Sequence, residues 1–214
     1  MDALTSVDSE KWNMVNKPVL MSESTFHRLT NEGGSTNWWA LQLVTEGKNI
    51  VDNKLSDDQS GIVLGSGDNT QEWKTKGWFT CDINPKFNPD IVVDANDLDE
   101  RVVPNSQDCL FAECLRFDSL SRNGVSPSRL LNQANKLLRE GGILVIETAN
   151  FEGIENTNVP KRDRYLSLMA KHGFNAVAEV FPYYDMGGGK LDQKVIYYGK
   201  KVVDGYNKDL FGDI

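Results

Sequence analysis

From Gly61 onward, the chain alternates short apolar segments with stretches of helical periodicity. The apolar segments are rich in Val, Ile and Leu, which is typical of strands that helices cover on both faces. An alternation of strands and helices favours a mostly parallel sheet. Seven strands are predicted, at residues 62–64, 78–81, 91–93, 109–112, 143–147, 176–181 and 194–198.

Helix signals and the final loop complete this pattern. Ser126 suits an N-cap and Pro127 the first helical position, an apolar stripe follows at helical spacing, and Gly141 is expected to end the helix. A second helix is predicted at residues 163–172. The last two strands are joined by a loop too short for a crossover helix, so we expect them to be antiparallel. We therefore predict an α/β fold: a three-layer, doubly wound, seven-stranded sheet, mostly parallel with an antiparallel last strand.

The N-terminal part of the chain differs from the rest. Residues 1–34 are polar and weakly patterned, and a helix is expected to begin near Trp38 and Trp39. Neighbouring residues on a helix diverge by about 100°, so the two tryptophans cannot both face the core squarely. We expect core packing, with one tryptophan covering the cofactor cleft as the alternative. Residues 1–60 are expected to form an N-terminal helical or lid segment of the same domain as residues 61–214.

Composition excludes several classes of protein. The net charge of −8 disfavours binding to phosphate backbones and anionic lipids. No apolar run approaches the roughly 20 residues of a membrane helix, and the N-terminus lacks the pattern of a signal peptide. Three cysteines without a CxxC pair, and only two histidines, argue against a metal site. Unpaired thiols favour a reducing compartment, so we expect a soluble, cytoplasmic protein without a nucleic-acid, membrane or metal partner.

Two features at strand ends indicate a ligand site. The first strand runs into Leu64-Gly65-Ser66-Gly67. Gly65 can adopt a positive φ and Gly67 removes the side chain where a ligand must approach closely, although an ordinary tight turn is the alternative. Asp82 ends the next strand, where a carboxylate can accept hydrogen bonds from both ribose hydroxyls of a nucleotide. Its alternative role is to cap the turn before Pro85.

Taken in order, these motifs resemble those of class I S-adenosylmethionine-dependent methyltransferases. The likeness covers residues 61 to about 200. It includes the glycine turn, Gly77-Trp78 leading to Asp82-Ile83-Asn84-Pro85, and Asp90-Ile91-Val92-Val93-Asp94-Ala95. The fourth strand, the helix leading into the fifth strand and the closing hairpin follow in the family's order. The resemblance implies S-adenosylmethionine as the cofactor and residues 61–214 as the methyltransferase domain that binds it.

The resemblance also implies a set of cofactor-binding residues at the carboxyl ends of the first four strands: Gly65, Ser66, Gly67, Asp82, Ile83, Asp94, Ala95, Ala112 and Glu113. The glycine turn would bring backbone amides to the amino-acid end of the cofactor. Asp82 would bind the ribose hydroxyls, and Ile83 would pack on the adenine. Asp94 would accept a hydrogen bond from the adenine amino group, and Ala95 would offer its backbone N–H to the ring. Ala112 and Glu113 would line the methyl-donor pocket.

Two departures from the family's pattern affect the contact to the cofactor's ammonium group. Leu64 stands where the family often has an acidic residue, and Asn69 replaces the third glycine. Asp68 or Glu113 could supply the contact. Thr70 stands where the GxGxxG motif of a nicotinamide-dependent dehydrogenase has a glycine, and such an enzyme would lack the closing hairpin. That dehydrogenase, and a methyltransferase-fold binding protein without catalysis, are the alternative functions.

We therefore expect an S-adenosylmethionine-dependent methyltransferase that acts on a small-molecule acceptor. The acidic surface and the lack of an added domain for gripping a macromolecule favour such an acceptor. His27 and Glu113 are the candidate catalytic residues, His27 as a general base in the N-terminal segment and Glu113 as an acceptor contact. Trp38 or Trp39, together with Tyr183-Tyr184, is expected to form a wall of the acceptor pocket. The identity of the acceptor and the oligomeric state stay open.

Overall fold

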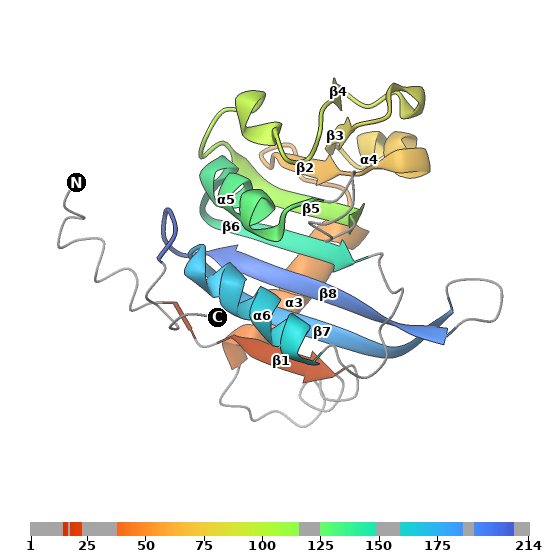
Figure 1. The fold of residues 1–214 in the computed structure, drawn as a ribbon. Coiled ribbons are helices and arrows are strands. Elements are labelled where there is room, and N and C mark those ends of the chain that lie inside the picture. The colour runs from red at the N-terminus through yellow and green to blue at the C-terminus, as the bar shows by residue number, and fades with distance from the viewer. Residues whose placement is uncertain are drawn as a thin grey trace.

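A single sheet forms the centre of the computed structural model, which describes residues 15–16, 18–22, 38–115, 125–148, 159–185 and 191–207. The strand order is β1-β7-β8-β6-β5-β2-β3-β4 (Figure 1). All neighbouring strands are parallel except β8, which runs antiparallel to both β6 and β7. The strands are β1 (Val19–Ser22), β2 (Gly61–Leu64), β3 (Phe79–Asp82), β4 (Ile91–Val92), β5 (Gln107–Leu115), β6 (Leu138–Thr148), β7 (Phe174–Asp185) and β8 (Leu191–Lys201).

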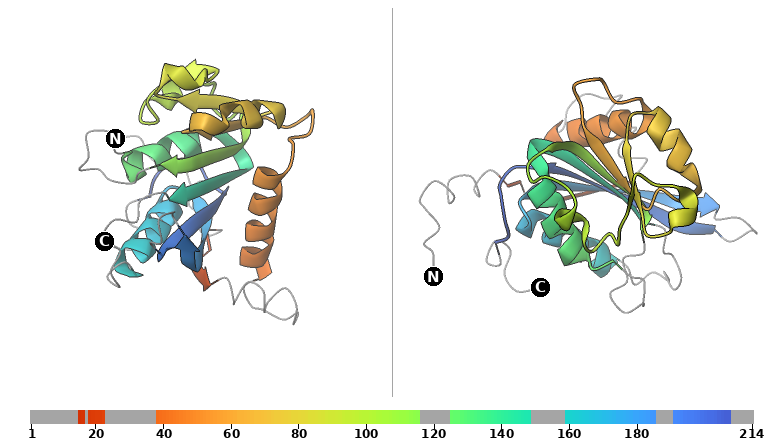
Figure 2. Two further views of the ribbon diagram at one scale, coloured as in Figure 1. Left: turned by 90° about the vertical axis from the view of Figure 1, so that its right-hand side faces the viewer. Right: turned by 90° about the horizontal axis from the view of Figure 1, so that it is seen from above.

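Helices cover both faces of the sheet, so the molecule has three layers (Figures 1 and 2). On one face α5 and α6 enclose an aliphatic core that includes Leu130, Leu137 and Leu144. On the other face α3 crosses the strands, and the core beneath it and α4 includes Trp73 and Tyr198. The helices are α3 (Trp38–Asp52), α4 (Thr70–Thr75), α5 (Pro127–Leu137) and α6 (Val159–Lys171), with the 3-10 turns η1 (Gly67–Asn69), η2 (Pro85–Phe87) and η3 (Leu98–Glu100).

The predicted α/β architecture is confirmed. A strand lies at each of the seven apolar segments, and the last two strands pair in the antiparallel sense. Every residue of β2 is buried, which explains its uninterrupted apolar sequence. Ser126 and Pro127 stand at the N-cap and the first position of α5, as the sequence predicts.

The sheet has eight strands rather than seven, because β1 adds to its edge. Val19 pairs with Val177 and Ser22 pairs with Val180, in parallel with β7. Val19–Ser22 lies in a polar, weakly patterned segment, outside the alternation of strands and helices that predicts the other seven strands. Deleting residues 1–34 to test whether the N-terminal segment is a lid would also remove this strand of the sheet, so the loss of a lid and the loss of β1 could not be told apart.

The end of α5 differs from the sequence-based expectation. The helix ends at Leu137, and Gly141, with a φ of 78°, lies within β6 instead of closing the helix. The ammonium group of Lys201 donates to the carbonyls of Asn135, at 2.6 Å, and Leu138, at 2.7 Å. These carbonyls are capped by a side chain from the far end of the chain, so the helix needs no glycine at its end.

Candidate functional site

The glycine turn lies at the carboxyl end of β2, between β3 and β5. The strand order reverses at β2, because β3 lies on one side and the later strand β5 on the other. Ligands of doubly wound sheets bind at such a point, outside the carboxyl ends of the strands. Gly65 and Gly67 have φ values of 72° and 45°, which favour glycine. A Cβ on Gly67 would meet no described atom within 4 Å, so the turn faces open space.

Asp82 connects the end of β3 to this turn. One carboxylate oxygen accepts the backbone N–H of Gly67 at 2.9 Å, and the other accepts the backbone N–H of Asn84 at 2.8 Å. The residue is only 8% exposed. A carboxylate can accept about four hydrogen bonds, so each oxygen retains capacity for a further donor. Asp82 therefore performs the turn-capping role and keeps acceptor capacity for a ligand.

The next residue along the chain is unusually exposed for its type. The Ile83 side chain is 61% exposed, directly beyond the buried Asp82. An exposed apolar side chain next to a carboxylate suits a ligand that has a flat apolar ring beside a hydroxylated sugar. The carboxyl end of β3 thus presents an exposed apolar side chain directly beside a carboxylate.

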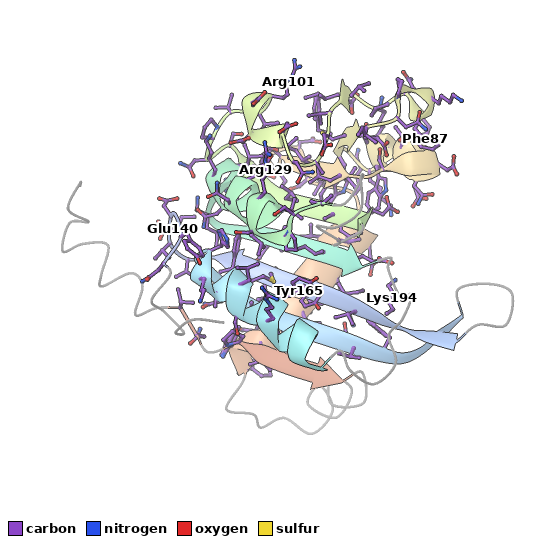
Figure 3. All side chains as sticks on the ribbon, viewed as in Figure 1. Phe87, Arg101, Arg129, Glu140, Tyr165 and Lys194 are labelled. Atoms are coloured by element: carbon purple, nitrogen blue, oxygen red, sulfur yellow. The ribbon has the colours of Figure 1, made fainter. Side chains whose placement is uncertain are left out.

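The loop after β4 carries Asp94 and Ala95, and it is docked on α5. Asp94 accepts hydrogen bonds from the backbone and side-chain N–H groups of Asn96. The carbonyl of Ala95 accepts from Gln133 of α5 at 3.1 Å. Arg129, also on α5, forms an ion pair with the same loop (Figure 3). The loop is therefore fixed from the α5 side, at the same edge of the sheet as the glycine turn.

The three remaining residues of the predicted set have different surroundings. Ala112 is fully buried in the core, and Ser66 is also buried, with its hydroxyl 2.8 Å from that of Thr70. Glu113 accepts hydrogen bonds from Asn69 and from the indole of Trp73. Burial raises the pKa of its carboxyl group above the ordinary value, against the lowering effect of these two bonds. These contacts of Glu113 were missed by the sequence analysis, and the asparagine in the third glycine position was their only signal.

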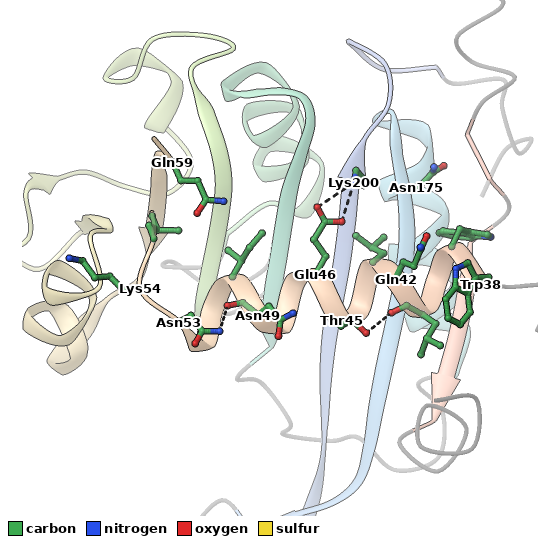
Figure 4. A pocket seen from close by; sticks show the side chains of 15 residues that line it. Trp38, Gln42, Thr45, Glu46, Asn49, Asn53, Lys54, Gln59, Asn175 and Lys200 are labelled. Carbon is green, nitrogen blue, oxygen red and sulfur yellow. Dashed lines mark hydrogen bonds and ion pairs between the residues drawn. The ribbon is translucent and has the colours of Figure 1, made fainter. Parts of the chain in front are cut away.

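The predicted acceptor walls do not gather around this turn. Trp38 and Trp39 begin α3 and line a groove of about 930 Å³ along that helix, together with Asn175 and Lys200 (Figure 4). Asn175 is the second residue of β7 and Lys200 the last but one of the antiparallel β8, so this groove opens toward the amino edge of the parallel strands. The expected core packing is confirmed for Trp39, which packs partly buried against the core beneath α3. The alternative, a tryptophan over the cofactor cleft, is wrong, because α3 crosses the sheet with its first turn far from β2. His27 and the side chains of Tyr183 and Tyr184 lie outside the described residues.

Two cysteines, Cys81 and Cys109, are buried free thiols. Burial raises the pKa of the Cys81 and Cys109 thiols to about 12, which leaves both protonated and inert near neutral pH. In the described part of the chain, no group of three or more His, Cys, Asp or Glu side chains is arranged to hold a metal ion. Among the same residues, no helix combines the length and the apolarity needed to cross a membrane.

Sequence comparison identifies no relative: no protein-family model and no curated protein matches the chain. Solved structures do match its fold. One is a chain from the complex between a Haloferax volcanii methyltransferase activator and the putative methyltransferase. It is 11% identical, with a TM-score of 0.52, and the match covers 80% of this chain and 97% of that one.

Two further solved structures are similar over most of their length. A S-adenosylmethionine-dependent methyltransferase from Thermotoga maritima, a possible histamine N-methyltransferase, is 18% identical with a TM-score of 0.47; the match covers 82% of this chain and 98% of that one. One from Archaeoglobus fulgidus is 13% identical with a TM-score of 0.48, over 84% of this chain and 100% of that one. The shared property is the fold. With its strand order, its antiparallel closing strand and its glycine turn, the chain has the Rossmann-like fold of class I S-adenosylmethionine-dependent methyltransferases.

Proposed function

We propose that the protein is an S-adenosylmethionine-dependent methyltransferase. The observation that carries this proposal is the meeting of the glycine turn, Asp82 and the exposed Ile83 at the point where the strand order reverses. Open space beside Gly67, a carboxylate with spare acceptor capacity and an exposed apolar side chain match the amino-acid, ribose and adenine parts of the cofactor in turn. Asp94 and the backbone of Ala95 extend this row along the same edge.

In this proposal, the chain's residues bind and orient rather than react. The cofactor supplies a methyl group that its sulfonium already activates. Gly65 and Gly67 allow close backbone approach, Asp82 holds the ribose, and Ile83 covers the adenine face. Alignment of an acceptor with the methyl group, and exclusion of water from between them, would then account for most of the rate acceleration. The packing of β1 and α3 on this sheet supports the further proposal that residues 1–60 and 61–214 form one domain.

Substitution of Asp82 tests the cofactor site. Asp82→Ala removes a charge-assisted acceptor for two hydroxyls and the anchor of the Gly67 N–H. We expect S-adenosylmethionine binding to weaken by about 2–3 kcal/mol, or roughly 30- to 150-fold, as measured by calorimetry. NAD serves as the comparison ligand, and tighter binding of NAD than of S-adenosylmethionine would favour the dehydrogenase instead.

Asp90 offers a matched control for this substitution. It also accepts a backbone N–H, that of Thr80 at 2.8 Å, but it precedes β4 and so lies at the opposite edge of the sheet from the glycine turn. Asp90→Ala should lower the free energy of unfolding without changing the cofactor affinity of the folded protein. If the folded Asp82 variant bound the cofactor as tightly as the wild type, the cofactor could not lie at the end of β3.

The proposed acceptor is a small molecule. The net charge of −8 and the exposed carboxylate of Asp68 beside the glycine turn support this choice over a nucleic acid, because they repel phosphates. Incubation with a cell extract and a methyl-labelled cofactor should place the label in the low-molecular-mass fraction. Label in RNA or DNA instead would contradict the proposal.

We also propose a cytoplasmic location. The buried, protonated thiols of Cys81 and Cys109 support it.

A binding protein that keeps this fold without catalysis is the second candidate. Two observations favour it: Asp82 already accepts the N–H of Gly67, and both oxygens of Glu113 already accept hydrogen bonds. Both arrangements reduce the contacts left for the cofactor's amino-acid end. Cofactor binding without methyl transfer to any fraction of the extract would support this candidate.

A further inference from the structure

Glu113 lies where β5 leaves the core, directly beside the glycine turn. Ala112 pairs with Leu64 in the parallel ladder between β5 and β2. Glu113 follows Ala112 and Gly65 follows Leu64, so Glu113 and Gly65 lie side by side. Ala112 is fully buried, so Glu113 is the first polar side chain at this end of β5.

The carboxylate of Glu113 joins both elements that follow the turn. One oxygen accepts from the side-chain amide of Asn69, in η1, at 2.7 Å. The other accepts from the indole N–H of Trp73, in α4, at 2.6 Å. Trp73 is itself fixed in the core, with its ring 5.6 Å from that of Trp78 and 5.2 Å from that of Phe111. A rigid aromatic cluster thus fixes the carboxylate, and the carboxylate fixes η1.

Local contacts hold the turn together but do not join it to β5: the hydroxyl of Thr70 donates to the carbonyl of Gly67 at 2.7 Å and lies 2.8 Å from the hydroxyl of Ser66. Among the described residues, neither Ser66 nor Asn69 caps the helix that it precedes with its side chain. With six residues, α4 is too short to be stable without tertiary contacts. The two hydrogen bonds to Glu113 are therefore the polar contacts that fix η1 and α4 relative to β5.

We propose that Glu113 is a positioning residue, which holds η1 and α4 against β5 and thereby sets the glycine turn in the shape that binds the cofactor. This inference rests on the proposed function and assigns Glu113 a role other than contact with cofactor or acceptor. It also explains the departure at position 69, because a glycine there could not donate to Glu113. Asn69 stands in place of the third glycine, and its side chain links the turn to β5 through Glu113.

The charge of Glu113 is essential to this arrangement. Both partners are N–H donors, so a protonated carboxyl group would direct its own O–H at a donor and lose one of the two bonds. Burial, Glu147 on β6 and Glu72 on α4 raise the pKa of Glu113, whereas Asn69 and Trp73 lower it. Lys194 forms an ion pair with Glu147 at 2.7 Å, which limits the effect of that carboxylate. Protonation at a higher pH than for an ordinary glutamate should therefore loosen the turn in mildly acidic solution.

Hydrogen exchange in the ligand-free protein tests the positioning role directly. Glu113→Gln keeps the size of the side chain but has only one acceptor oxygen, so amides of residues 65–75 should exchange faster. Trp73→Phe removes the indole N–H and retains an aromatic ring, and it should produce a smaller increase in the same amides. Glu72→Gln is the control: this exposed residue of α4 forms a surface ion pair with Lys76, and within the described part of the chain no hydrogen bond joins its side chain to β5, so at neutral pH exchange should change little.

Cofactor affinity provides the second measurement. Glu113→Gln should weaken S-adenosylmethionine binding roughly tenfold at pH 7.5. Binding by the wild type should weaken as the pH is lowered from 7.5, beginning at a higher pH than an ordinary glutamate would give, and the variant should lack that dependence. Asn69→Ala should weaken binding by a smaller factor. The double variant should bind no more weakly than Glu113→Gln alone, because Asn69 acts through Glu113.

The outcomes separate this inference from the proposed function. Unchanged exchange in both Glu113→Gln and Trp73→Phe would overturn the positioning role. Faster exchange in a protein whose wild type does not bind S-adenosylmethionine would leave the positioning role intact and overturn the proposed function. Tight binding by the wild type with additive effects of Asn69→Ala and Glu113→Gln would show that the two residues act separately, which also contradicts the inference.

Discussion

The two halves of the sheet are built in different ways. In the half with the glycine turn, β2, β3 and β4 have 4, 4 and 2 residues, and 3-10 turns connect β3, β4 and β5. In the other half, β6, β7 and β8 have 11, 12 and 11 residues, and a helix of 13 residues precedes β7. The short strands end in loops that acidic side chains fasten to backbone N–H groups, such as Asp82 to Gly67 and Asp90 to Thr80.

Because of this difference, the β6–β8 half contributes most of the stability and the β2–β4 half carries the candidate ligand site. Long ladders and a continuous apolar core give the β6–β8 half its stability, because both contributions grow with strand length and buried area. In the β2–β4 half, single polar contacts fix the loops, and each contributes about 1 kcal/mol. Substitutions in the β6–β8 half should therefore change stability most. Substitutions of side chains at the carboxyl ends of β2 and β3, beside the glycine turn, should change ligand affinity more than stability.

The largest expected effect concerns Lys201 in the β6–β8 half. Its buried ammonium donates to two carbonyls at the end of α5 and to Asn105, and it forms an ion pair with Asp204 at 2.6 Å. Lys201→Met leaves the buried carbonyls of Asn135 and Leu138 without this donor, so the free energy of unfolding should fall by about 3–5 kcal/mol. Urea denaturation measures this loss. Lys200→Met is the matched control, since Lys200 forms a half-exposed ion pair with Glu46 and should cost less than about 1 kcal/mol. Equal losses of unfolding free energy in the two variants would show that the buried contacts of Lys201 contribute no more to stability than a surface ion pair.

An intermediate effect is expected from acid, through His172 at the end of α6. The ring is 3% exposed, and burial lowers its pKa to about 4. Between about pH 6.5 and pH 4, the unfolded chain takes up a proton that the folded protein does not, so stability falls as pH falls through this window. The loss due to this residue should reach at most about 3 kcal/mol. His172→Gln, compared with the wild type in urea at pH 7.5 and pH 5, should reduce the acid sensitivity; identical pH dependence in both proteins would contradict it.

The smallest effect on stability is expected at Ile83, in the β2–β4 half. Ile83→Ala removes apolar area that would cover the adenine, so S-adenosylmethionine binding should weaken about 5- to 10-fold. The free energy of unfolding should change by less than about 0.5 kcal/mol, because the side chain is exposed in the free protein. Val103→Ala, at another exposed apolar position away from the glycine turn, should change neither quantity. A large loss of stability in Ile83→Ala would show that this half also depends on apolar packing.

The sequence predicted the candidate site less completely than the fold. It placed the glycine turn, Asp82 and Asp94 at strand ends, and parallel strands bring these ends to one edge of the sheet. It could not show that Asp82 binds Gly67, or that Glu113 reaches Asn69 across 44 positions of the chain. It also placed the tryptophans of α3 at the site, because periodicity gives the faces of a helix but not the direction in which it crosses a sheet.

The sequence by itself determined the order of strands and helices from Gly61 onward, the start of α5 at Pro127 and the antiparallel closing strand. These features follow from local rules: apolar runs of strand length, proline in a first helical turn, and a loop too short for a crossover. Only the tertiary structure decided the addition of β1 to the edge beside β7, the end of α5 under Lys201 and the fastening of the glycine turn by Glu113. Each of these depends on hydrogen bonds between groups far apart in the chain, for which no local pattern of residues exists.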